Sequence, residues 1–135
     1  MLISKTSRYA LQAATYLAKR WKDGDVVQAR EIAEHTGVPQ NYLSKILHQL
    51  ARQGVLVSER GPKGGFRLTM DPAKTNLTAI LEPVEGGLTE QHCLLGRPSC
   101  SDRDPCLAHT GWKALSVELT RFLDETVLAD LVEHG

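Results

Sequence analysis

The residues of this chain that could do chemistry are gathered in one short segment. All three of its cysteines fall within fourteen residues, at Cys93, Cys100 and Cys106 of the stretch CLLGRPSCSDRDPCLAH. A loop interrupted by glycine and proline can let three thiolates converge on one centre, and thiolates are preferred ligands of zinc and of iron–sulfur clusters. The spacing therefore indicates a metal or iron–sulfur site.

Other uses of the cysteines stay open at this point. A disulfide with one spare thiol is disfavoured, because the count is odd and the first residues do not resemble a secretory signal. A structural zinc site and a metal-free thiol redox switch remain as alternatives. A nucleophilic cysteine paired with a histidine is conceivable, but no orienting acid or amide and no catalytic scaffold is evident, so we expect no enzyme.

Three thiolates leave a four-ligand site one donor short. His109 is the first choice, because it follows Cys106 by three residues. If a helix begins near Cys106, the two side chains lie about 60° apart on one helical face. His92, a residue from another segment and a residue from a second subunit are the alternatives.

Length and charge bound the rest of the molecule. A chain of 135 residues can hold one domain with a core and an appendage. Net charge is zero, yet residues 1–75 carry 12 Lys and Arg against 6 Asp and Glu, whereas residues 76–135 carry 4 against 10. This distribution predicts an N-terminal part that meets a polyanion. No stretch approaches a membrane span, so we expect a cytoplasmic protein.

The N-terminal half has the pattern of three helices. Apolar residues recur at helical spacing from about residue 6 to 21, from 28 to 36, and from 39 to 53. Gly37 separates the second and third helices, which gives the layout of a helix-turn-helix. The third helix is expected to bury the stripe Leu43, Ile46, Leu47 and Leu50.

A hairpin is expected to follow. Residues 55–59 alternate like a strand, 60–65 form the turn RGPKGG, and 66–68 form the returning strand. A hairpin after a helix-turn-helix makes a winged helix, with Arg60 and Lys63 at the tip of its wing and Arg67 just beyond. The predicted fold class is therefore mainly α with a small β-wing.

The C-terminal part is predicted to serve assembly. A short helix over 77–85 precedes the cysteine loop, and a long helix runs from about 107 to 125. Its apolar residues at 112, 115, 119 and 122 follow a heptad pattern, which favours pairing with a second copy over packing on its own core. We expect a DNA-binding domain at 1–75, a linker helix and cluster loop at 76–106, and a dimerisation helix with a short terminal helix at 107–135.

Nearly the whole chain resembles a family of winged-helix regulators. The resemblance is carried by SRYAL, by YLSKIL in the recognition helix, by the wing GVLVSERGPKGGFRL, by the three-cysteine loop and by the final CLAHTGWKALSVELTRFLDETVLADLV. The combination of an RGPxGG wing with a cysteine triad is similar to the Rrf-two family, typified by IscR and NsrR.

That resemblance implies a homodimeric transcription factor whose iron–sulfur cluster controls DNA binding, with RNA polymerase as a further candidate partner. Cys93, Cys100 and Cys106 match the cluster ligands, and His109 matches the fourth ligand of the IscR branch. The NsrR branch uses an acidic residue near the N-terminus of the partner subunit, where this chain has Arg8. The IscR-like arrangement is therefore favoured, and with it a 2Fe–2S cluster over a 4Fe–4S cluster.

Binding to double-stranded DNA is expected to follow the geometry of paired winged helices. Two recognition helices would enter successive major grooves about 34 Å apart on a pseudo-palindromic operator. Arg60 is the candidate for the minor groove. The candidates for base edges are Gln40, Asn41, Ser44 and Lys45. The candidates for phosphates are Lys5, Arg8, Lys63 and Arg67.

Overall fold

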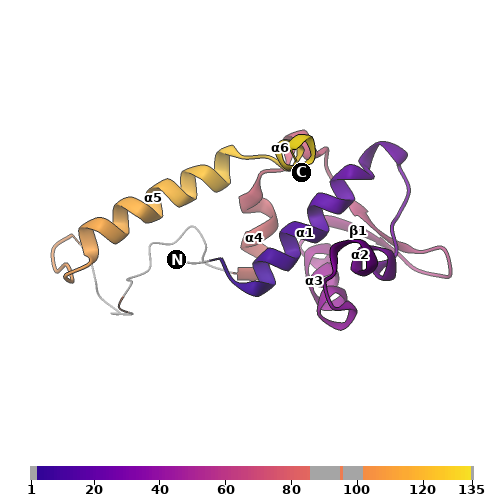
Figure 1. Cartoon of the computed structure of the whole chain (residues 1–135), viewed down its shortest axis with the longest axis horizontal. Coiled ribbons are helices and arrows are strands. Elements are labelled where there is room, and N and C mark those ends of the chain that lie inside the picture. Colours follow the sequence, from indigo (N-terminus) through magenta and orange to yellow (C-terminus); the bar gives the residue numbers. More distant parts are fainter. Residues whose placement is uncertain (1–2, 86–94, 96–101, 135) are drawn as a thin grey trace.

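The computed structural model describes residues 3–85, 95 and 102–134 of the chain. A body of five α-helices and a two-stranded sheet holds the core, and one long helix extends from it (Figure 1). Within the described residues, no helix has both the length and the apolar character needed to cross a membrane.

Helix α1 (Lys5–Lys19) runs through the body and contacts most of the other elements. Its first turn is capped by Ser4, whose hydroxyl accepts a hydrogen bond from the backbone N–H of Ser7. Ala10, Ala13 and Ala14 are fully buried along one face. Because these side chains are small, neighbouring helices can approach the α1 backbone closely.

Helices α2 (Ala29–Thr36) and α3 (Gln40–Arg52) form the predicted helix-turn-helix. Gly37 ends α2 with φ of 78°, a left-handed conformation that glycine adopts without steric cost. Pro39 then precedes the first turn of α3. The predicted stripe of α3 is confirmed, because the four residues Leu43, Ile46, Leu47 and Leu50 are all buried.

The wing is an antiparallel pair of β1 (Leu56–Glu59) and β2 (Gly65–Leu68). Val27 extends this pair, since its N–H and C=O exchange two hydrogen bonds of 2.8 Å with Phe66. At the tip, a Cβ on Gly64 would lie 2.2 Å from the carbonyl oxygen of Glu59. The predicted turn therefore requires glycine at this position on steric grounds.

Two further helices close the core on the other side of α1. These are α4 (Leu77–Glu85), which follows the short 3-10 turn Pro72–Lys74, and α6 (Leu128–His134). Backbone hydrogen bonds from Leu77 to Thr126 and from Leu128 to Thr75 hold their starting points together. Buried side chains of α4 and α6 join those of α1 and α3 in one continuous hydrophobic core.

Helix α5 (His109–Glu125) extends away from this body (Figure 1). Leu123, near its end, is its one fully buried side chain among the described residues. Leu115 is 61% exposed and Phe122 is 56% exposed, so two of the four predicted heptad positions face solvent in the single chain, whereas Trp112 and Leu119 are half-buried. The helix begins two residues later than predicted, because residues 106–109 form a tighter turn in which the His109 N–H bonds the Cys106 carbonyl.

Candidate nucleic-acid interface and cysteine segment

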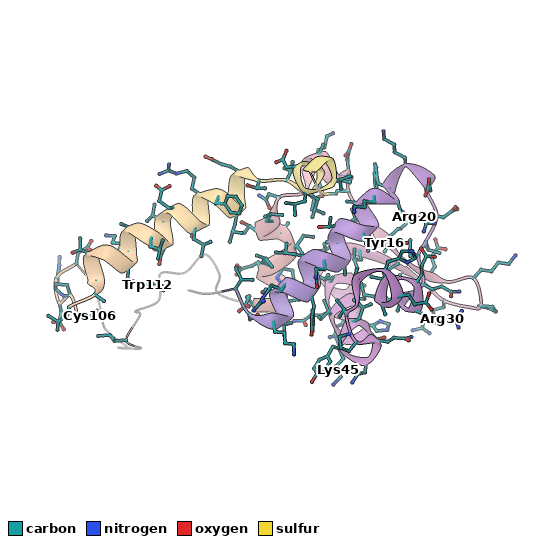
Figure 2. The ribbon with its side chains drawn as sticks, in the orientation of Figure 1. Tyr16, Arg20, Arg30, Lys45, Cys106 and Trp112 are labelled. Carbon is teal, nitrogen blue, oxygen red and sulfur yellow. The ribbon has the colours of Figure 1, made fainter. Side chains whose placement is uncertain are left out.

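The first turns of α3 present polar side chains on the face opposite the buried stripe. Gln40, Asn41 and Lys45 are exposed, and Ser44 is half-buried. Lys45 points away from the body in Figure 2. Tyr42, also on this face, is 57% exposed. The structure thus brings together the four side chains predicted to read base edges, on one accessible surface.

A groove of about 590 Å³ separates the start of α3 from the wing. Gln40 of α3 and Arg60 of the wing, both predicted DNA contacts, line it. Gln28, Arg30 and His48 also line it, and sequence reasoning did not single them out. Their signal was weak, because lone polar residues on helices are common and only the folded chain places them beside the wing. We call this space the wing groove, defined by Gln28, Arg30, Gln40, His48 and Arg60.

The walls of the wing groove are tied to each other. The Gln28 side-chain amide donates a hydrogen bond of 3.0 Å to the Pro62 carbonyl at the wing tip. The His48 ring stands edge-on to Phe66, with 5.3 Å between ring centroids. These contacts fix the wing against both helices of the helix-turn-helix.

The other predicted phosphate contacts are distributed more widely. Lys63 is exposed at the wing tip, whereas Arg67 lines a separate cavity of about 380 Å³ with Trp21 and Asp25. Alternation along β2 explains this, since Phe66 and Leu68 occupy the buried face and Arg67 the other. Arg67 is therefore not among the residues that line the wing groove.

The start of α1 lies beside the start of α3. Lys5 and Arg8 are both exposed on the first turns of α1. The Lys5 ammonium lies 5.8 Å from the ring centroid of Tyr9, and that ring lies 6.5 Å from the ring of Tyr42. An aromatic pair thus connects a predicted phosphate contact to the recognition helix.

A charged network joins α1 to α2. The Tyr16 hydroxyl donates a hydrogen bond of 2.5 Å to Glu31, which also pairs with Arg20. The Tyr16 hydrogen bond holds the pKa of Glu31 below its usual range. Burial and the bond to Glu31 raise the pKa of Tyr16. Figure 2 shows Tyr16 and Arg20 along α1 where it faces α2, so this network fixes the first helix of the motif in place.

The last turn of α4 is hydrogen-bonded to both helices that carry predicted DNA contacts. Glu85 accepts hydrogen bonds from the hydroxyls of Ser4 and Ser7, the latter at 2.6 Å. The Ser4 and Ser7 hydroxyls lower the pKa of Glu85. From α3, the Gln49 side-chain amide donates to the Pro83 carbonyl at 2.6 Å. The next residues along the chain lead into the cysteine segment.

Two of the predicted metal ligands, Cys93 and Cys100, lie outside the described residues. Cys106 is half-buried, and in Figure 2 it is found at the far end of α5, away from Arg30 and Lys45. Among the described residues alone, no group of three His, Cys, Asp or Glu side chains could hold a metal ion.

His109, the predicted fourth ligand, has a carboxylate partner that the sequence did not suggest. Its Nε2 atom lies 2.9 Å from Oδ1 of Asp102. The Lys113 ammonium donates to both oxygens of Asp102, at 2.9 and 2.8 Å. Lys113 and His109 hold the pKa of Asp102 below its usual range. Metal-bound histidines commonly have such a partner for the ring nitrogen that does not bind the metal.

The fold and the exposed polar helix define a winged-helix protein of the DNA-binding class. A family described as "Rrf2: Iron-dependent Transcriptional regulator" matches residues 3–134. The chain belongs to this family, the one that the sequence motifs indicated as Rrf-two.

Known relatives agree with this assignment. A protein named as a putative HTH-type transcriptional regulator of Aquifex aeolicus is 36% identical and spans 98% of this chain and 92% of its own length. The HTH-type transcriptional regulator IscR of Yersinia enterocolitica is 33% identical, over 99% of this chain and 80% of its own length. These relatives are transcriptional regulators, so the expectation that this chain is not an enzyme is confirmed.

A solved structure confirms the fold class. The structure of CymR, the global cysteine regulator of Bacillus subtilis, superposes with a TM-score of 0.83 at 23% identity, over 100% of this chain and 98% of its own. The mainly helical fold with a two-stranded wing is thus that of an Rrf2-type regulator.

Proposed function

We propose that this regulator is a homodimer whose operator affinity is set by an iron–sulfur cluster that responds to iron supply, redox state or nitric oxide. The observation that carries the cluster assignment is the contact of 2.9 Å between His109 and Asp102. His109 follows Cys106 by three residues in the sequence. The likeness to IscR of Yersinia enterocolitica supports the same reading. The proposed ligands are Cys93, Cys100, Cys106 and His109.

The donor set suits a 2Fe–2S cluster better than a 4Fe–4S cluster. Three thiolates and one imidazole supply four ligands, and histidine replaces cysteine in some 2Fe–2S centres. When bound, the cluster would supply a redox-active centre that is lost more readily than one held by four thiolates. Within the protein, Asp102 would orient the His109 ring, and Lys113 would keep that carboxylate charged.

DNA recognition is proposed to use both copies of the winged helix. Residues 1–75 would form the DNA-binding part, 76–106 the link and cluster loop, and 107–135 the dimerisation part. The apolar side of α5 suits pairing with a second copy, because Leu115 and Phe122 are exposed there. The proposed base and phosphate contacts are Gln40, Asn41, Ser44, Lys45, Arg60, Lys63, Arg67, Lys5 and Arg8.

The route from the cluster to DNA is proposed to pass through the last turn of α4. Cys106 lies far from the DNA-binding helices of its own chain, so contact between them is not direct (Figure 2). Glu85 and Pro83 are hydrogen-bonded to α1 and α3, and the cluster loop begins just after them. A change in the loop would therefore act on α1 and α3 through these hydrogen bonds.

The test is to purify the protein without oxygen, measure iron and sulfide per chain, record the visible absorption, and titrate each form onto DNA. We expect brown protein with iron and sulfide, and DNA affinity that changes when the cluster is removed. Cys106→Ser should abolish iron retention, and His109→Ala should weaken it and shift the spectrum.

Three results would contradict the proposal. Colourless protein with zinc would indicate a structural site, and protein without metal but with thiol-dependent DNA binding would indicate a thiol switch. Equal DNA affinity of the cluster-loaded and cluster-free forms would remove the sensing role.

Glu118→Gln, on the exposed side of α5, is the matched control and should leave iron content unchanged.

A further inference from the structure

The wing groove lies where one strand of a bound duplex must pass. A recognition helix occupies the major groove, and a wing arginine such as Arg60 reaches the neighbouring minor groove. One sugar–phosphate strand separates these two grooves in B-DNA. Because the wing groove lies between α3 and the wing, the strand that separates the two DNA grooves would pass along it.

Arg30 is a cation that lines this groove from α2. It is exposed on the first turn of α2 and lines the groove together with Gln40 and Arg60. No described residue forms a hydrogen bond or ion pair with its guanidinium. Among the described residues, Glu59 of β1 is the one acidic side chain that lines the groove. An exposed arginine without a partner is available to bind an anion.

Hydrogen bonds also tie the start of α2 to the wing. Gln28 bonds the wing tip through the Pro62 carbonyl, and Val27 exchanges two backbone bonds with Phe66 of β2. Both residues directly precede α2, so the helix that carries Arg30 and the wing move as one unit. A binding site fixed in this way loses little entropy when it orders a ligand.

We propose that the wing groove holds one phosphodiester strand of duplex DNA and that Arg30 binds its phosphates. This inference rests on the DNA-binding function proposed above, and it adds a contact that is independent of base sequence. Arg30 contributes affinity and fixes the position of the duplex relative to α3 and the wing. Gln40 contacts base edges, and Arg60 responds to the width of the minor groove.

The charge of Arg30 has a measurable signature. Each phosphate that a protein neutralises contributes about −0.9 to the slope of log affinity against log salt concentration. Loss of one such contact weakens binding by about eightfold at about 0.1 M salt and has little effect near 1 M. The loss is the same for an operator and for a shuffled sequence, because phosphates are common to both.

The experiment uses the full-length protein and two fluorescein-labelled duplexes, one selected from a random pool by the wild-type protein and one with that sequence shuffled. Affinity is measured over a range of salt concentrations for wild type, Arg30→Ala, Arg30→Gln and Arg30→Lys. For the Ala and Gln variants, we expect the slope of log affinity against log salt concentration to be less steep by about 0.9 on both duplexes. The Lys variant should keep the wild-type slope.

Lys74→Ala is the matched control, since it removes an exposed cation in the 3-10 turn Pro72–Lys74, outside the wing groove. Circular dichroism checks that each variant is folded. An unchanged slope for Arg30→Ala and Arg30→Gln would overturn the inference, as would a loss confined to the selected duplex. If wild type enriches no duplex from the random pool, the proposed DNA-binding function fails instead, which is a different result.

Discussion

Ser7 is a polar residue with no exposure to solvent, and it meets Glu85, 78 positions later in the chain. A buried hydroxyl without a partner costs about 1–3 kcal/mol. The Glu85 carboxylate removes this cost by accepting its hydrogen bond and that of Ser4. The same carboxylate lies at the start of α1, where a negative charge is favoured by the helix dipole.

This contact predicts a dependence of stability on pH. Because the Ser4 and Ser7 bonds lower the pKa of Glu85 in the folded chain, its contribution is present above the ordinary glutamate pKa and is lost as pH falls through the lowered value. Glu85→Gln should therefore reduce the free energy of unfolding by about 1–2 kcal/mol at neutral pH. The difference from wild type should shrink in acid, as measured by urea denaturation across a pH series.

A control separates this effect from a general loss of negative charge. Glu34→Gln removes an exposed carboxylate from α2 and should change stability by less than about 0.5 kcal/mol. A difference between wild type and Glu85→Gln that stays constant down to strongly acid pH would show that the Glu85 charge does not matter.

At the scale of elements, α5 is the helix whose packing is incomplete in a single chain. Trp112 and Leu119 are half-buried, and Leu115 and Phe122 are exposed on the same side. These four residues have heptad spacing, which suits the seam between two helices. An isolated helix with this surface would be only marginally stable in water.

Dimerisation through α5 predicts the effect of a charge in the seam. Leu115→Asp would place two carboxylates in the dimer interface and remove two leucines, at about 1.5–3 kcal/mol each. The dissociation constant of the dimer should then rise by at least about a hundredfold, since about 1.4 kcal/mol is a factor of ten. Sedimentation equilibrium measures this directly.

Val117→Asp is the matched control, because Val117 lies on α5 but outside the heptad positions. Both variants introduce the same charge into the same helix. Equal dissociation constants for the two variants would exclude this side of α5 as the interface.

The elements themselves could be predicted from local patterns, and their relations to one another could not. Helix α3 was predictable because Leu43, Ile46, Leu47 and Leu50 repeat with the period of a helix. The carboxylate partner of His109 depends on a turn that no pattern specifies. Arg30 was missed because its role depends on the distance between α2 and the wing, which is a property of the packed chain.

At the scale of the whole molecule, α4 connects the two ends of the proposed switch. Its last turn is bonded to α3 by Gln49 and to α1 by Ser4 and Ser7. Allosteric coupling between two sites is typically about 1–3 kcal/mol, or about 5-fold to 150-fold in affinity. One hydrogen bond of about 0.5–1.5 kcal/mol is thus a substantial part of such a coupling.

The connection predicts what happens when the Gln49 bond is removed. Gln49→Leu keeps most of the side-chain volume but cannot donate to the Pro83 carbonyl. The ratio of DNA affinities between cluster-loaded and cluster-free protein should move toward one by about 2-fold to 10-fold. Fluorescence anisotropy on both forms measures the ratio.

The exposed Gln53, at the end of the same helix, supplies the comparison variant Gln53→Leu, which should leave this ratio unchanged. If Gln49→Leu alters the DNA affinity of both forms equally, Gln49 stabilises α3 without taking part in the coupling.

The long arm of α5 also has an electrical consequence. The helix-turn-helix and the wing lie in the part of the sequence where basic residues outnumber acidic ones, whereas α5 carries Lys113 and Arg121 against Glu118, Asp124 and Glu125 and is slightly negative. A polyanion therefore attracts the end of the molecule with the helix-turn-helix and the wing more strongly than it attracts the arm. We expect encounters with DNA to favour approach by that end, so that association is faster than the zero net charge of the protein would suggest.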